Sequence, residues 1–395
     1  MPVDEIQQLI ARVGSSDDDG TAAARLVLIG ADAVAPLLEE LRGAEPDRIA
    51  PLTRTVSRIR VGGALRHLEP LARDPDYKVA PAAITAIGFS LDSDAFRVLA
   101  ELLGGTTPHR DRVVRALGEL GDPRAREVLT AEAVKLVADP QDAAALAAAT
   151  TQAREDEDPS SLRSYIAIGV ALAKLGDHSL AHAIGALSGY DRAAEQDPES
   201  YIVRLEATHG LKILVGPGVF ERLVEALDDR SREVQESAMR TMLLLGAKQS
   251  VVAWIDLERA HSPLAALAHA MTHELVGEWP AGSELVEQVD DHQLSSWWTD
   301  RDSKFLIGTT YRFGRRAWPP DLFPHLDDLS VIDDLRIITG LDFGLHVDPL
   351  LLLDGAPNAI ARTAMAWWQA HGQRFDHGGL YKYGHRQDLS RVFES

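Results

Sequence analysis

Two histidines, His269 and His273, have the spacing best suited to chemistry in this sequence. Residues four positions apart share one face of a helix, so both imidazoles could reach one divalent metal ion, with Glu274 directly beside them. Three later side chains could complete the ligand set: Asp290, Asp291 and His292. The alternative is a pair of polar histidines on an exposed helix face. We favour that alternative, and we expect no bound metal and no cofactor.

A second cluster combines cations with aromatic rings. Its cations are Arg312, Arg315 and Arg316, and its rings are Tyr311, Phe313 and Trp318. Guanidinium groups bind anions through paired hydrogen bonds, and rings stack on planar groups. Upstream, Trp297 and Trp298 could form an aromatic pocket or an exposed patch. The cluster and the tryptophan pair together predict a partner-binding surface, against the alternative of core packing and pairing with the protein's own carboxylates.

Two other groups of basic side chains have structural explanations. His178 and His182 follow a helix corner beside Asp177, where capping is the expected role. The C-terminal stretch could bind an anionic ligand through His371, Arg374, His377, Lys382, His385 and Arg386. A structural cap is the preferred interpretation of that stretch.

The remaining motif signals are negative. The sequence has no G-x-G-x-x-G, no G-x-x-x-x-G-K-[ST], no G-x-S-x-G and no H-E-x-x-H, so nucleotide, hydrolase and zincin readings have no support. It has no cysteine, which excludes disulfides and thiolate chemistry. An enzyme is therefore not the favoured class.

Charge and hydropathy limit the classes of partner and the cellular location that we expect. The chain has 60 acidic and 40 basic residues, and its net charge of −20 would repel a phosphate backbone over most of the surface. We therefore expect another protein as the partner rather than nucleic acid. The acidic N-terminus is unlike a signal peptide, and no run approaches 18 apolar residues, so we expect a cytoplasmic protein without a membrane contact.

The segment 109–135 shows the structural unit that repeats along the chain and on which any functional site must be built. Val113, Ala116, Leu117 and Leu120 lie on one face of a helix, and the same apolar pattern restarts after a corner. The corner residues are Gly121, Asp122 and Pro123. Glycine can adopt the left-handed conformation that ends a helix, aspartate can cap the next helix, and proline suits its first turn. The segment therefore predicts a helical hairpin.

Corners of this kind recur along the chain. Their residues are Gly30, Gly62, Leu91, Gly121, Gly176, Gly216 and Gly246. The usual step of about 30 residues, with two helices in each step, predicts an all-α fold, an α-solenoid. We expect the solenoid at 1–279 and an irregular, aromatic-rich C-terminal cap, continuous with it, at 280–395.

Two stretches interrupt the array between 139 and 200. The stretch 139–161 predicts an alanine-rich helix that runs into a solvated acidic loop, and a hinge or a partner-binding loop is the alternative. The stretch 185–200 predicts an extended loop. These departures and the segment after 279 are where function is expected.

The repeated units resemble short HEAT-like repeats, including those of phycobilisome-lyase-type proteins. The shared pattern is an Asp-Pro or Asp-Asp turn followed by V-x-x-A-A-x-x-A-L-G-x-L-G-D-x-x-A-x-x-x-L. It is matched best at 74–103, 113–129 and 228–257. The resemblance implies the fold and says little about function, because such repeats serve lyases, scaffolds and regulators alike.

The C-terminal segment resembles the closing segment of uncharacterised bacterial HEAT-like proteins. The matching residues are Ile338-Thr339-Gly340, Asp342-Phe343-Gly344, Trp367-Trp368, Arg374-Phe375, Gly378, Tyr381 and Gly384. Some of those relatives are encoded near genes of a bacterial secretion system, which implies an accessory role there. HEAT-repeat iron hydroxylases use several His-Glu pairs, whereas this chain has one, at His273-Glu274.

Together these patterns favour a non-catalytic scaffold or adaptor that binds another protein. A right-handed superhelix should present a long concave face formed by the second helix of each pair, such as 123–135 and 219–228. The alternatives are a ligand- or cofactor-handling protein resembling the phycobilin lyases, a secretion accessory protein, and a DNA-repair protein resembling HEAT-fold glycosylases.

Overall fold

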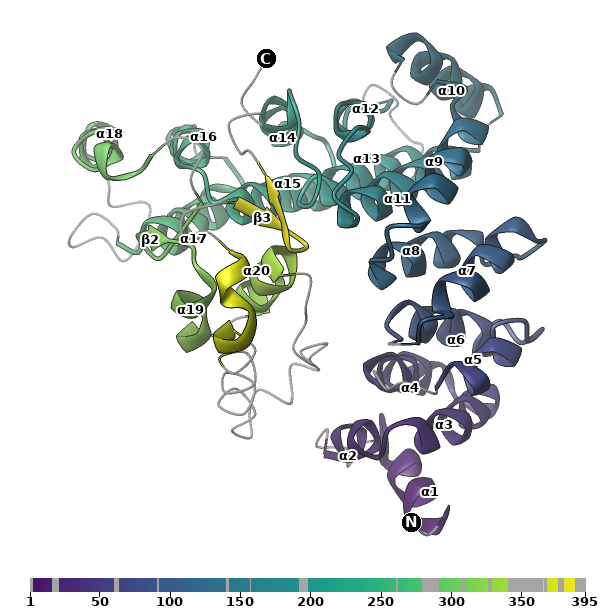
Figure 1. The fold of residues 1–395 in the computed structure, drawn as a ribbon. Coiled ribbons are helices and arrows are strands. Elements are labelled where there is room, and N and C mark those ends of the chain that lie inside the picture. The colour runs from purple at the N-terminus through teal and green to yellow at the C-terminus, as the bar shows by residue number, and fades with distance from the viewer. Residues whose placement is uncertain are drawn as a thin grey trace.

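The protein is described by a computed structural model (Figure 1). The structure describes residues 3–15, 21–59, 64–90, 92–139, 142–156, 158–191, 198–260, 262–278, 291–306, 310–325, 329–339, 365, 368–375 and 380–387. Within these ranges, the chain is an α-solenoid.

Most of the helices follow one another along the chain as pairs, in which a first helix leads through a corner into a second helix, and they form two layers (Figure 1). The first helices of the pairs are α2 (Thr21–Ile29), α4 (Pro46–Arg58), α6 (Val79–Gly88), α8 (Arg110–Leu120), α11 (Ser160–Lys174), α13 (Pro198–Gly210), α15 (Arg232–Leu245) and α17 (Ala265–Val276). The second helices are α3 (Ala31–Gly43), α5 (Leu65–Leu71), α7 (Ala95–Gly104), α9 (Ala125–Leu136), α12 (Ala181–Leu187), α14 (Val219–Ala226), α16 (Lys248–Arg259) and α18 (Asp291–Thr299). Helix α1 (Val3–Arg12) packs before the first pair, and α10 (Ala143–Glu155) is an extra helix between the pairs α8/α9 and α11/α12.

The Gly-Asp corner forms in part as its sequence predicts. Gly121 ends α8 with a φ of 70°, in the left-handed region. The carboxylate of Asp122 accepts a hydrogen bond of 2.9 Å from the backbone N–H of Arg124, which orients the turn into α9. Gly121 therefore has the predicted role, whereas Asp122 and Pro123 lie before Arg124, the N-cap of α9, so neither the predicted cap nor the proline in the first turn is present.

The other corners confirm the pattern with one correction. Gly30, Gly176 and Gly246 have positive φ angles, as expected. The prediction at Gly216 was wrong, because the left-handed residue of that corner is Gly218, which directly precedes α14. The corner at Gly277, with a φ of 79°, was not predicted. The corners at 62 and 91 lie outside the described residues.

Small residues allow the first helices to stack closely. A Cβ atom on Gly88 of α6 would lie 2.8 Å from the Cα of Ala116 in α8, and one on Gly118 would lie 2.8 Å from the Cα of Ala171 in α11. The array bends with α11, α13 and α15 on its inner side and α12, α14 and α16 on its outer side (Figure 1). The prediction that the second helices form the concave face was therefore wrong. Close packing of small side chains puts the first helices there.

The irregular stretches are more helical than expected. The alanine-rich helix is present as α10, and a short turn leads from it into α11. The extended loop predicted at 185–200 is only partly correct, because α12 continues to Leu187, turns occupy 188–191 and α13 begins at Pro198. Residues 192–197 lie outside the described part of the chain.

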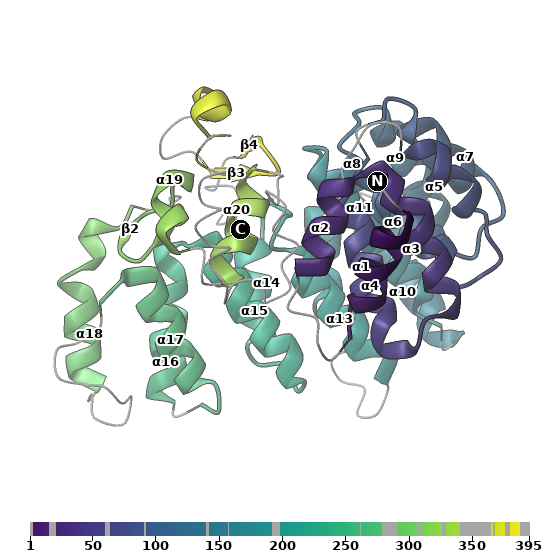
Figure 2. The same ribbon diagram turned by 90° about the horizontal axis from the view of Figure 1, so that it is seen from below.

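The C-terminal elements combine helices with two short antiparallel hairpins. After α18 come η2 (Asp302–Lys304), β1 (Tyr311–Arg312), β2 (Arg315–Arg316), α19 (Pro319–Leu322), η3 (Phe323–His325), α20 (Leu329–Thr339), η5 (Gly372–Arg374), β3 (Leu380–Lys382) and β4 (His385–Gln387). Figure 2 shows the strands at one edge of the array. The closing pattern predicted from sequence is only partly described, since Gly340, 342–344, Trp367 and Gly378 lie outside it.

This region contains the same module twice, 70 residues apart. The aromatic series Trp298, Phe305 and Tyr311 recurs as Trp368, Phe375 and Tyr381. In the first series the ring centroids are 5.5 and 4.8 Å apart, and in the second they are 5.2 and 4.8 Å apart. The hairpin turns also match, because Phe313 and Tyr383 both have a φ of 51° and each precedes a left-handed glycine.

Each hairpin turn caps the C-terminal end of a helix. The backbone N–H of Phe313 donates to the carbonyl of Glu274 in α17 at 2.7 Å, and the N–H of Gly314 donates to that of Leu275 at 2.9 Å. In the second module, Tyr383 and Gly384 donate in the same way to Ile337 and Ile338 of α20, at 2.5 and 2.9 Å. Carbonyls at a helix end have no partner within the helix, so both hairpins satisfy groups that the helices leave open.

The second module also returns to the middle of the array. The ammonium of Lys174, at the end of α11, lies 5.2 Å from the Tyr383 ring centroid, and that ring packs against the main core. His385 lies so close to Gly176 that a Cβ there would be 3.1 Å from its ring. The first helices from α11 to α17, the first hairpin, α20 and the second hairpin therefore form a closed ring of contacts.

Candidate functional site

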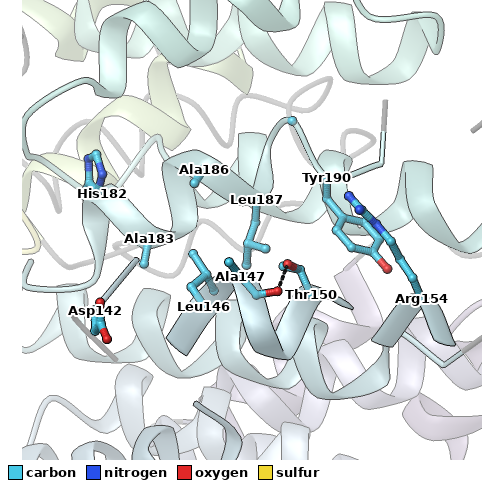
Figure 3. Close-up of a pocket in the computed structure, with 11 residues that line it drawn as sticks. Asp142, Leu146, Ala147, Thr150, Arg154, His182, Ala183, Ala186, Leu187 and Tyr190 are labelled. Atoms are coloured by element: carbon cyan, nitrogen blue, oxygen red, sulfur yellow. Dashed lines mark hydrogen bonds between the residues drawn. The ribbon is translucent and has the colours of Figure 1, made fainter. Parts of the chain in front are cut away.

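A groove lies between α10 and α12, in the stretch where the repeat is interrupted. Its cavity has a volume of about 260 Å³ and is lined by Asp142, Leu146, Ala147, Thr150, Arg154, His182, Ala183, Ala186, Leu187, Gly189 and Tyr190. Figure 3 shows the row of side chains from α10 facing the row from α12. Both helices lie on the outer side of the array (Figure 1).

The composition of the two helices explains why the space stays open. Helix α10 is AAALAAATTQARE and α12 is AHAIGAL, so the facing positions carry mainly small side chains. Leu146 and Leu187 supply most of the apolar floor and are buried. The Thr150 hydroxyl donates to the Ala147 carbonyl at 2.8 Å, which satisfies it within α10 (Figure 3). The floor is therefore apolar, with one internally paired hydroxyl beside it.

Arg154 and Tyr190 form one end of the groove. The guanidinium carbon of Arg154 lies 5.3 Å from the Tyr190 ring centroid, and its Nε lies 3.5 Å from a carboxylate oxygen of Asp191. The Arg154 side chain is 50% exposed, so its pairing with Asp191 is weak and its terminal nitrogens can still donate. This end of the groove is suited to an anionic group.

Tyr190 is held in place by a buried ion pair. The guanidinium of Arg204 donates to the Tyr190 carbonyl at 3.1 Å and to the carboxylate of Asp229 at 2.8 and 3.3 Å. Arg204 and Asp229 are almost fully buried, so their geometry is fixed by packing. The ring that supports Arg154 therefore rests on the rigid part of the array.

Asp142 and His182 form the other end. The Asp142 carboxylate accepts a hydrogen bond of 3.0 Å from the N–H of Ala144 and so caps α10. Its remaining lone pairs and the exposed imidazole of His182 can accept or donate hydrogen bonds. The groove thus has an apolar centre and two polar ends of different character.

The predicted arginine and tryptophan cluster is divided between core and surface. Arg312 is buried and donates to the carboxylate of Asp334 in α20 at 2.6 and 3.1 Å. Trp297 and Trp298 are also buried, within the first module, and Arg312 links that module to α20. Arg315 and Arg316 are exposed on β2, and Trp318 packs edge-on against Trp368 at 5.1 Å. A partner contact at Arg315 and Arg316 stays a prediction.

The histidine pair has a buried carboxyl group as its neighbour. His269 Nδ1 lies 4.0 Å from Glu258 Oε2, while His273 is exposed. Burial raises the pKa of the Glu258 carboxyl to about 8, and burial, followed by the nearby His273, lowers the pKa of His269. Both groups are therefore held neutral; a neutral imidazole can still bind a metal ion, whereas the Glu258 carboxyl would first have to lose its proton. Within the described residues, no three side chains form a set of metal ligands, and Asp290 lies outside that part of the chain.

The other basic groups have mainly structural contacts. His178 accepts a hydrogen bond of 3.2 Å from the backbone N–H of Val215, which joins two neighbouring repeats. His182 lies at the groove, which was not predicted. In the C-terminal stretch His385 contacts Gly176, and His377 lies outside the described residues.

Comparisons with known proteins agree with the repeat architecture. Residues 65–149 match the family described as HEAT repeats. This part of the chain is therefore similar to HEAT repeats, in agreement with the α-solenoid. The match does not distinguish repeats of the phycobilisome-lyase type and does not reach the closing segment, so both of those resemblances stay predictions. No curated protein matches the sequence.

Several solved structures are distantly similar to this chain. An engineered protein is 15% identical, covering 92% of this chain and 98% of its own, with a TM-score of 0.29. A designed armadillo repeat protein is 15% identical, covering 60% and 98%, with a TM-score of 0.26. A computationally designed armadillo repeat protein for modular peptide recognition is 17% identical, covering 67% and 98%, with a TM-score of 0.24. Scores this low carry no argument about function.

Two features of this chain, the duplicated module and the groove, were not predicted from the sequence. The repeated W-W, F and Y-x-x-G spacing was visible in the sequence and would have identified the duplicated module. The groove had a weaker signal, an alanine-rich helix at the interruption of the repeat. No described helix is both long and apolar enough to cross a bilayer.

Proposed function

We propose that this protein is a non-catalytic scaffold that binds another protein. The observation that carries the proposal is the groove between α10 and α12, with an apolar floor and polar ends, beside the inserted helix α10. An inserted helix that leaves space beside it adds surface for a partner and little packing to the core.

The character of the titratable groups supports binding over catalysis. Within the described residues, burial raises the pKa of Tyr165 and of Glu258 well above the usual range. Neither lines the groove. A catalytic site would need perturbed groups to converge in an accessible cavity.

Site-specific photo-crosslinking tests this proposal. A photoreactive amino acid is placed at the exposed position 147 in the groove, at 115 on inner helix α8, or at 252 on outer helix α16, and the full chain is expressed in its source cells. The proposal predicts a reproducible protein adduct from 147 or 115 and none from 252. Recovery of the chain without any protein adduct, or with a stoichiometric metal or small cofactor, would contradict it.

A further inference from the structure

The groove between α10 and α12 has a more specific chemistry than a general protein contact. We infer that it binds a short peptide segment of the partner, with two neighbouring aliphatic side chains on the floor and a carboxylate at Arg154. This inference rests on the proposed scaffold function and names the chemistry of its partner.

The volume limits the size of the group that the whole groove, with its polar ends, can enclose. About 260 Å³ equals the space of roughly nine water molecules, or about nine non-hydrogen atoms. Two leucine-sized side chains have about that number. The floor that they would contact is formed by Leu146, Ala183 and Leu187, which are all buried below the surface of the groove.

The two ends of the groove determine which polar groups the ligand needs on either side of its apolar part. At one end the half-exposed guanidinium of Arg154 lies over Tyr190 and has only a 3.5 Å contact with Asp191, so a ligand carboxylate can form a paired hydrogen bond with it. At the other end the Asp142 carboxylate and the His182 imidazole suit a backbone N–H or a hydroxyl.

A peptide matches this arrangement better than a simple lipid. A fatty acid has one charged end, so its methyl end would lie against Asp142 and His182 and remove water from both of them. A peptide has polar backbone groups at each end of its apolar side chains. The anionic end lies against Arg154, a local cation in a chain whose net charge of −20 would otherwise repel it.

The experiment selects peptides and then blocks the groove. A random 12-residue peptide library displayed on phage is selected against the full-length chain, and the enriched peptides are measured by fluorescence anisotropy. The inference predicts enrichment of two aliphatic residues close to Asp or Glu. It also predicts that Ala147→Trp, which fills the groove from its exposed rim, weakens binding at least about tenfold.

Matched variants identify the site. Ala148→Trp places the same ring on a neighbouring exposed position of α10 outside the groove and should change affinity less than about twofold. Arg154→Gln should weaken the acidic peptide by about five- to tenfold and leave its Gln-substituted analogue unchanged. Circular dichroism of each variant shows whether it is folded.

Several outcomes would overturn the inference. These are the absence of any enriched peptide, enriched peptides that bind Ala147→Trp as well as the wild type, and an acidic preference that survives Arg154→Gln. A long-chain carboxylate that copurifies and is lost in Ala147→Trp, seen by native mass spectrometry, would show a lipid instead. If photo-crosslinking at 115 still captures a partner, the scaffold proposal stands and only the groove is wrong.

Discussion

The two halves of the array are held together in different ways. The helices from α1 to α9, the open half, pack on helices that are close to them in the sequence. From α11 to β4 the chain closes on itself, because the second module reaches back to Lys174 and Gly176 at the end of α11. An open array gains stability only from neighbours, whereas a closed one also gains from a contact between residues far apart in sequence.

The groove lies where these two halves meet. Helix α10 follows the last pair of the open half, and α12 belongs to the first pair of the closed half. Helix α10 packs on α11, and α12 packs on α11, α13 and α14, so both walls of the groove rest on the closed half.

The largest expected effect comes from breaking the link between the two modules. Arg312→Ala leaves the carboxylate of Asp334 buried without its cation, at 5% exposure. Loss of one partner of a buried ion pair costs about 3–5 kcal/mol of the free energy of unfolding. Urea denaturation should show this loss in the closed half.

Arg97→Ala is the control for that loss. Arg97 pairs with Glu101 at 2.8 Å on the exposed surface of the open half. We expect a loss below about 1 kcal/mol there. Equal losses in the two variants would argue against a buried link in the closed half.

A pH experiment examines a buried acid of the closed half. Because burial raises the pKa of Glu258 from 4.5 to about 8, the folded state keeps a proton that the unfolded chain releases. Its stabilising contribution is complete below pH 4.5 and is lost as pH rises through about 8. Glu258→Gln should remove this fall, which we expect to be on the order of 2–4 kcal/mol between pH 5 and 8.

The neighbouring His269 has the opposite effect on the pH dependence of the free energy of unfolding. Burial lowers the pKa of His269, so its contribution is present above pH 6.5 and is lost as the pH falls. The measurement is urea denaturation across this pH range, with the exposed Glu155→Gln as control. A wild-type stability that does not fall between pH 7 and 8 would contradict the assignment for Glu258.

Two corner glycines compare the halves directly. Gly121→Ala meets no neighbouring atom within 4 Å, so it should cost only the left-handed strain, about 1–2 kcal/mol. A Cβ on Gly246 would lie 2.6 Å from Thr310 and 2.8 Å from the N atom of Tyr311, so Gly246→Ala should cost more, because the first hairpin must move. Thermal denaturation measures both, and equal costs would show that the hairpin is not a fixed part of the closed half.

A glycine inside α3 is the control for these two variants, because its replacement by alanine should change the free energy of unfolding in the opposite direction. Gly43→Ala lies at the helical end of α3 with no atom within 4 Å of its new Cβ. Alanine is a better helix former than glycine, so this variant should be stabilised by up to about 1 kcal/mol.

The smallest expected effect is at the closing contact. His385→Ala removes an exposed imidazole from beside Gly176 and should cost less than about 1 kcal/mol. Its effect should instead appear locally, as faster hydrogen exchange at the end of α11 and in β3 and β4. Unchanged exchange at α11 would mean that the contact does not couple these elements.

The sequence predicted the fold where local chemistry decides it. Gly121 and Asp122 determine the corner through backbone conformation and a single hydrogen bond, and both can be recognised from residue type. The inner position of the first helices depends on Gly88 and Gly118 meeting alanines of the next repeat. That contact joins residues of different repeats, so a pattern within one unit does not reveal it.

The candidate site was harder to predict for the same reason. Arg312 and Trp298 looked suited to a partner, but tertiary contacts bury them. Ala147 and Ala186 looked inert, but the distance between α10 and α12 makes them walls of a groove. Burial and spacing between helices, rather than residue type, decide both cases.

Native-state hydrogen exchange of the full-length wild type tests the closed half most directly. If the ring is closed, the slowest amides of α11, α13, α15, α17 and α20 should exchange through one shared opening, while those of α2, α4 and α6 exchange through separate openings of lower free energy. Protection that declines steadily from the middle toward both ends, with α20 as weakly protected as α2, would show an open array and contradict the account.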